Sequence, residues 1–85
     1  MSTYLIYGKV IKPVPLSNGK GGKIITEPQS TFRALNYGGQ RVSKLSEAGE
    51  YYEKSMAQKI IDYQKKCWEK KGYPDHILYE IREVK

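Results

Sequence analysis

The sequence predicts an α+β fold, in which one long amphipathic helix packs on one face of a small, mainly antiparallel sheet of three to four strands. Two observations predict it. Residues 46–71 carry apolar side chains at helical spacing, whereas β-branched and aromatic side chains gather in shorter segments elsewhere. Glycine and proline separate these segments. The expected order is β-β-(β)-α-β, within a single domain of residues 1–85.

The first strand is expected at residues 4–12. Both alternating sets of its side chains are largely apolar, so we expect both faces to be covered and the strand to be central. Gly8, in the middle, indicates a bulge or a close approach of the backbone. Proline has no amide hydrogen to donate, so Pro13 and Pro15 should end the ladder.

A second short strand is expected at residues 23–27. It would form a hairpin with the first strand through a long loop that includes the glycine-rich turn region of residues 17–22, and Pro28 would end it.

The next segment, residues 30–37, fits two structures. It could be a third strand with Phe32 and Ala34 pointing inward, or a helical turn capped by Ser30 or Thr31. We favour the strand. A loop should follow at residues 36–40, where two glycines are adjacent.

The long helix is expected to begin near Ser46 or Gly49 and to end at Lys71. Ser46 could cap its first turn, because a serine hydroxyl can accept a hydrogen bond from a free amide there. Gly72 can adopt the left-handed conformation that follows many helices, and Pro74 prevents continuation. Alternation in residues 77–84 then predicts the last strand, with isoleucine and tyrosine on one face.

Two apolar stripes follow this helix, about 100° apart. We expect the first to face the sheet; it comprises Tyr52, Met56, Ile60, Tyr63 and Cys67. The second could pack in the same core or mediate self-association; it comprises Ala57, Ile61 and Trp68. A core position is favoured, because exposing so many apolar side chains on a small protein is unfavourable. A monomer is accordingly slightly favoured over a homodimer.

Catalysis has little support in the sequence. His76 is the single histidine and lies in an expected turn, and Cys67 is the single cysteine and lies on the presumed core side of the helix. These two residues cannot supply a zinc site within one chain, and a buried thiol is typically inert. Residues 18–23 lack the pattern of a nucleotide-binding loop. We therefore expect no catalytic residue, no metal and no cofactor.

The composition also predicts where the protein functions. The longest apolar run is residues 4–7, far too short to cross a membrane, and the first residues do not resemble a secretory leader. A lone cysteine suits a reducing compartment. We expect a cytoplasmic protein without a membrane partner.

Charge is distributed unevenly along the chain. Residues 1–45 contain seven basic residues and one acidic residue, whereas residues 46–85 contain eight of each, so the net charge of +6 belongs to the first half. A one-sided excess of this kind is typical of anion-binding surfaces, although it also occurs where charge serves only solubility. Lysines outnumber arginines 12 to 3, which favours contact with phosphates over reading of bases.

Two clusters in the basic half are candidates for a binding surface. The glycine–lysine loop of residues 18–23 could contact phosphates, or could be a plain hairpin connection. Residues 33–44 combine arginines, amides and a tyrosine suited to stacking, or could form a simple strand-to-helix linker. The predicted nucleic-acid or partner-binding residues are Lys12, Lys20, Lys23, Arg33, Asn36, Tyr37, Gln40, Arg41 and Lys44.

Two functional hypotheses follow. In the first, a small non-catalytic protein engages a polyanion, most simply a nucleic-acid backbone or a nucleoprotein, through its basic half. In the second, a regulator or inhibitor of the kind encoded by phages and mobile elements docks on an acidic surface of a partner protein.

Overall fold

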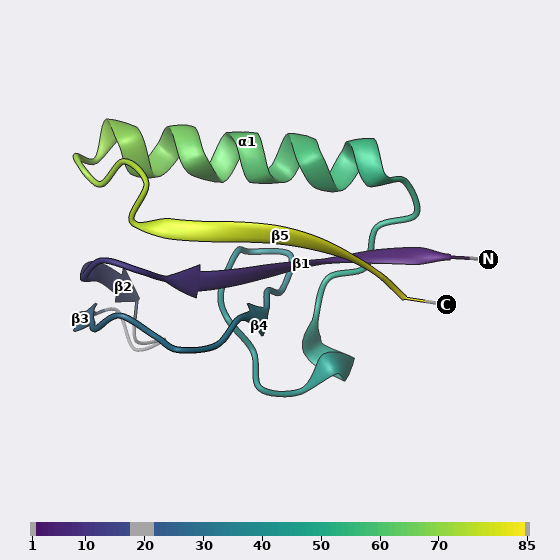
Figure 1. Cartoon of the computed structure of the whole chain (residues 1–85), viewed down its shortest axis with the longest axis horizontal. Helices are drawn as coiled ribbons and strands as arrows, with labels where there is room; N and C mark the ends of the chain where they lie inside the picture. Colours follow the sequence, from purple (N-terminus) through teal and green to yellow (C-terminus); the bar gives the residue numbers. More distant parts are fainter. Residues whose placement is uncertain (1, 18–21, 85) are drawn as a thin grey trace.

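The computed structural model describes residues 2–17 and 22–84, and within them a three-stranded antiparallel sheet, a separate two-stranded sheet and a long helix are arranged as Figure 1 shows. The elements are β1 (Thr3–Val10), β2 (Val14–Ser17), β3 (Lys23–Thr26), β4 (Arg33–Ala34), a short 3₁₀ turn η1 (Leu45–Glu47), α1 (Lys54–Lys70) and β5 (Ile77–Val84). The α+β prediction is confirmed. Among the described residues, no helix combines the length and apolar character needed to span a membrane.

The larger sheet has the strand order β4-β1-β5, so the first strand is central, as predicted. β5 pairs with β1 along its whole length, from Thr3 opposite Val84 to Val10 opposite Ile77. The pairing continues through Gly8 without a bulge. Instead, Gly8 allows a close approach, because a Cβ atom there would lie 3.3 Å from Cδ2 of Leu35.

The predicted hairpin between the first two strands is wrong in its pairing. β3 pairs with β2 in a sheet of its own, and β2, which begins between the two prolines, was not expected. Pro13 lies just before β2, as expected for a residue that ends a ladder, but Pro15 sits inside it, opposite Ile25. A two-stranded ribbon has an open edge on each strand, so it tolerates a residue without an amide hydrogen.

The preference for a strand after residue 30 is confirmed, although β4 is only two residues long. Ala34 points inward and is buried, whereas Phe32 lies just outside the strand and is partly buried.

The predicted start of the helix is wrong by several residues. α1 begins after Glu53, whose side chain makes no capping hydrogen bond, and Ser46 lies in η1 rather than at a helix cap. The cause is tertiary. The amide of Tyr51 donates to the carbonyl of Tyr4 at 2.9 Å, and the amide of Tyr4 donates back to Tyr51 at 2.7 Å. The chain is thereby held in an extended conformation beside β1, although its composition favours a helix.

The end of α1 follows the sequence prediction. Gly72 has φ of 91° and donates to the carbonyl of Glu69 at 3.1 Å, while the amide of Tyr73 donates to the carbonyl of Trp68 at 2.9 Å. The rings of Trp68 and Tyr73 meet edge to face, with centroids 6.1 Å apart. These bonds and the ring contact form a Schellman motif, which satisfies the last carbonyls of the helix.

Replacing Gly72 with alanine should lower the free energy of unfolding by about 1 kcal/mol. A Cβ atom there meets no heavy atom within 4 Å, so the loss would come from the positive φ alone. Thermal unfolding, monitored by circular dichroism, measures this loss of stability. Gly38→Ala is the control, because Gly38 is also in an exposed turn but lacks a positive φ. Equal losses in the two variants would contradict this explanation.

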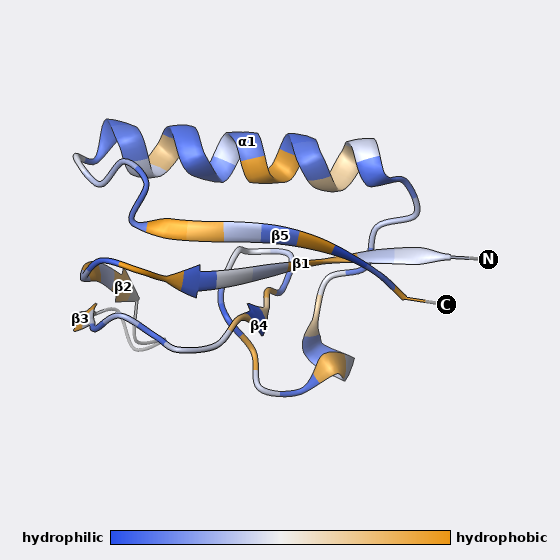
Figure 2. Cartoon of the chain, in the orientation of Figure 1, coloured by the Kyte–Doolittle hydropathy of each residue, from blue (hydrophilic) through white to orange (hydrophobic). Residues whose placement is uncertain are grey.

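The helix face that packs most closely on the sheet is the second stripe; of the expected stripe, Ile60 and Cys67 are partly buried, and Ile60 packs against the core. Ala57 and Ile61 are 0% and 4% exposed, whereas Tyr52, Met56 and Tyr63 are 70%, 49% and 64% exposed. Figure 2 shows the hydrophobic side of α1 turned toward β5 and β1. A small alanine lets the helix approach the sheet closely, and tyrosines on the other stripe keep their hydroxyls in water.

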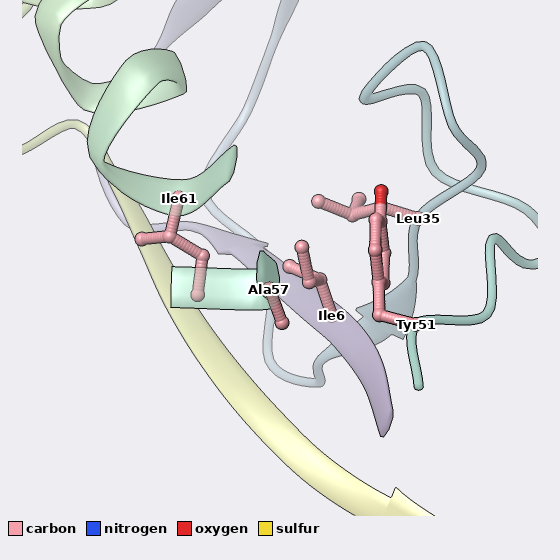
Figure 3. Close-up of a cluster of buried hydrophobic side chains, with 5 residues drawn as sticks. All are labelled: Ile6, Leu35, Tyr51, Ala57 and Ile61. Atoms are coloured by element: carbon pink, nitrogen blue, oxygen red, sulfur yellow. The ribbon is translucent and has the colours of Figure 1, made fainter. Parts of the chain in front are cut away.

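The residues considered for self-association therefore belong largely to the core. Figure 3 shows Ala57 and Ile61 grouped with Ile6, Leu35 and Tyr51, which form one buried cluster. Because α1 and the sheet already cover Ala57 and Ile61, they are not available to a second copy. Trp68 is partly buried at the end of the helix.

Candidate functional site

The structure describes the side chains of most predicted binding residues. Lys20 and the side chain of Lys23 lie outside the described part of the chain. Lys12 is exposed just after β1, where its amide donates to the carbonyl of His76 at 3.3 Å. Lys44 is exposed just before η1. Within the described residues, no hydrogen bond or ion pair joins either lysine to the other predicted residues.

Residues 36–40 form the predicted loop, and it is held by its own hydrogen bonds. The side-chain oxygen of Asn36 accepts hydrogen bonds from the amides of Gly38 and Gln40, both at 2.9 Å. The side-chain amide of Asn36 donates to Oε1 of Gln40 at 3.3 Å. Gly39 has φ of 82° and approaches α1 so closely that a Cβ atom would lie 2.8 Å from Nε2 of Gln64. Asn36 is therefore a structural residue of this loop.

Tyr37 anchors the loop to the segment before the helix. Its hydroxyl donates to the carbonyl of Glu50 at 3.2 Å and accepts from the amide of Glu50 at 3.0 Å. Its ring meets Tyr51 edge to face at 5.7 Å and lies against Gly49, where a Cβ atom would come within 2.9 Å. Tyr37 is 67% exposed, but the hydrogen bonds of its hydroxyl and the contacts of its ring fix its position. These contacts favour the linker interpretation for this tyrosine.

Arg33 and Arg41 are brought together, and we call them the arginine pair. Arg41 lies opposite Leu35 in an isolated antiparallel bridge, and Arg33 is two residues before Leu35, on the same side of the strand. Burial, together with the neighbouring charge of Arg33, lowers the pKa of the Arg41 guanidinium. In the part of the chain that the structure describes, neither guanidinium has a carboxylate partner. Two cations without a carboxylate partner among the described residues therefore occupy neighbouring positions on one face.

A second group, which the sequence did not single out, lies on the sheet face turned away from α1. The guanidinium carbon of Arg82 is 4.1 Å from the ring centroid of Tyr7 and 5.8 Å from that of Phe32. The ammonium of Lys9 is 5.7 Å from the Phe32 centroid. We call Tyr7, Lys9, Phe32 and Arg82 the aromatic–basic face. It combines two rings with two cations from three separate segments of the chain.

A shallow pocket of about 330 Å³ lies beside the aromatic–basic face, and of the arginine pair only Arg33 lines it. Tyr7 and Phe32 line it from the sheet and Arg33 lines it from β4. The remaining lining residues are Thr31, Ala34, Val42, Ser43 and Leu45. Leu45 is 61% exposed, so one rim of this pocket is apolar.

The described residues show no arrangement suited to metal binding, since no three His, Cys, Asp or Glu side chains come together among them. Nδ1 of His76 lies 3.2 Å from the carbonyl oxygen of Pro13, and its ring meets Tyr73 edge to face. Cys67 is a free, partly buried thiol. The contacts of His76 place it in the packing around the end of α1.

Comparison with known proteins does not assign a function. No protein-family model, curated protein or solved structure matches this chain. The arginine pair, the aromatic–basic face and the pocket beside that face are therefore the features from which a function can be proposed.

Proposed function

We propose that this protein is a non-catalytic binding protein that engages a polyanion, most simply the backbone of a nucleic acid. The arginine pair carries the proposal. Arg33 and Arg41 occupy neighbouring positions, and among the described residues neither has a carboxylate partner, so their charges repel each other and a bound phosphate would relieve that repulsion. The planar guanidinium also matches the geometry of phosphate oxygens.

The distribution of charge supports the same ligand. The net excess of +6 lies in residues 1–45, which include the arginine pair and three members of the aromatic–basic face. Lysine dominates this excess, and lysine contacts phosphates without reading sequence. We therefore propose binding to the backbone without strong sequence preference.

Reversing both charges of the arginine pair tests the proposal. Arg33→Glu/Arg41→Glu should weaken binding to a labelled oligonucleotide of about 20 nucleotides by at least roughly tenfold. It should also make the salt dependence shallower by about one to two units on a log–log plot, because fewer counterions are released on binding. Fluorescence anisotropy over a range of salt concentrations measures both quantities.

The control is Lys59→Glu/Lys66→Glu, which changes the net charge equally on the exposed outer side of α1. Its affinity should change far less. Equal losses in the two variants would show that overall charge, and not the arginine pair, governs binding. If the wild type does not bind even at low salt, the nucleic-acid proposal fails.

A regulator that binds another protein is the second candidate, and the exposed stripe of α1 favours it. Met56 and Tyr63 of α1, and Tyr52 just before it, are largely exposed. Tyrosine and methionine are enriched at protein interfaces. Tyr52→Ala/Tyr63→Ala would weaken a protein complex but leave oligonucleotide binding unchanged, which separates the two candidates.

A further inference from the structure

The two faces of the larger sheet are covered to different extents. α1 packs on the face that carries Ile6 and Ile81. On the other face, the segment that includes η1 covers only part of the surface, where Leu5, Ala34 and Ala48 form a small buried cluster. Tyr7 is packed against this cluster but stays partly exposed, and Lys9 beyond it is also partly exposed. The aromatic–basic face therefore remains open to a ligand.

The strand register explains how the aromatic–basic face is assembled. Tyr7 lies opposite Ala34 of β4 on one side and opposite Glu80 of β5 on the other. Arg82 follows Glu80 on the same face, and its Nε donates to Oε2 of Glu80 at 2.7 Å. This contact is an ion pair, and it holds the guanidinium over the Tyr7 ring and near that of Phe32. The side chains are thus fixed in place before any ligand binds.

The chemistry of this face fits an unpaired nucleotide better than a duplex. Rings and guanidinium planes stack on base faces, which are exposed in a single strand and hidden in a duplex. The charged groups of Lys9 and Arg82 lie 5.7 Å and 5.8 Å from the Phe32 centroid and can contact the phosphates of a nucleotide whose base stacks there. The pocket of about 330 Å³ beside Phe32 is at the small end of the range for small-ligand sites, which suits a single base.

We infer that the aromatic–basic face binds single-stranded nucleic acid, with an unpaired base stacked on Phe32 in the adjacent pocket and Lys9 and Arg82 beside its phosphates. The inference rests on the proposed function and specifies its ligand as unpaired strands. It assigns a binding role to Tyr7, Lys9, Phe32 and Arg82.

Phe32→Leu is the decisive variant, because it removes the ring but keeps an apolar side chain of similar size. Binding to a labelled single strand of about 20 nucleotides should weaken on the order of tenfold, from the loss of one stacked base. Binding to the duplex of the same sequence should change by less than about twofold, and the salt dependence should not change, because no charge is removed. Fluorescence anisotropy measures each affinity.

Tyr52→Leu is the matched control, because it removes an aromatic ring that is 70% exposed just before α1. It should leave both affinities unchanged. A second readout needs no variant: titration of the wild type with the single strand should shift the Phe32 ring protons upfield in the NMR spectrum, as stacking on a base requires. This readout decides the matter if Phe32→Leu does not fold.

Failure of this inference can be told apart from failure of the proposed function. If the wild type binds the duplex as tightly as the single strand, or if Phe32→Leu weakens both equally or neither, base stacking is overturned while backbone binding stands. If the Phe32 ring protons do not shift when the protein is saturated with the single strand, base stacking is likewise overturned while backbone binding stands. If the wild type binds neither oligonucleotide at low salt, both proposals fall.

Discussion

Ile61→Ala should lower the free energy of unfolding by about 2–5 kcal/mol. Ile61 is 4% exposed and lies between α1 and the sheet in the cluster that contains Ile6 and Ala57. Removing most of its side chain would leave a cavity that neighbours on the rigid sheet cannot fill. Chemical denaturation followed by circular dichroism measures the loss.

Tyr63→Ala provides the comparison, because it removes a larger side chain from the other stripe of the same helix. Tyr63 is 64% exposed, so its loss should lower the free energy of unfolding by less than about 1 kcal/mol. Similar denaturation midpoints for the two variants would mean that α1 is rotated about its axis relative to the arrangement described above.

Above pH 10 the protein should lose stability because of Tyr79. Burial raises the pKa of the Tyr79 phenol from 10.0 to about 12, although a hydrogen bond with Trp68 acts in the opposite direction. The folded protein therefore keeps a proton that the unfolded chain releases. The corresponding stabilisation is complete below pH 10 and disappears as the pH rises through about 12, a loss of up to about 2–3 kcal/mol.

Tyr79→Phe should remove this part of the decline. The free energy of unfolding, measured by denaturation at about pH 9 and about pH 12, should fall less in the variant than in the wild type. Part of the decline should persist, because burial and the nearby Tyr37 also raise the pKa of Tyr51. Tyr52→Phe, at an exposed position, is the control. An identical decline in wild type and Tyr79→Phe would refute the role of Tyr79.

Local features of the sequence predicted most elements but not how they meet. The alternation in β1 and β5 and the glycine that ends α1 act within a few residues, so they could be recognised directly. The start of α1 could not, because the hydrogen bonds between Tyr4 and Tyr51 that delay it join distant parts of the chain. The helix face was missed because both stripes are apolar, and only the packing shows that Ala57 and Ile61 are the most buried residues of the two.

For the candidate site too, sequence reasoning found the residues that lie close together in the sequence and missed those that only the fold brings together. Arg33 and Arg41 were recognised because they are close together in the sequence. Tyr7, Phe32 and Arg82 were not, because only the register of β1 with β4 and β5 brings them to one face. Tyr37 was assigned to binding from its residue type, which stays a prediction, and its hydrogen bonds to Glu50 add a structural role that the sequence did not indicate.

The pairing of the first strand with the last has a consequence for how the protein folds. The hydroxyl of Thr3 donates to the carbonyl of Val84 at 3.5 Å, across 81 positions of the chain. Contacts of such long range must close a large loop before they stabilise anything, which slows folding relative to helical proteins of similar size. During synthesis, β1 would leave the ribosome with two largely apolar faces and no neighbour on its β5 side until residues 77–84 followed. The nascent chain should therefore be most prone to aggregation, and most dependent on chaperones, just before its last strand appears.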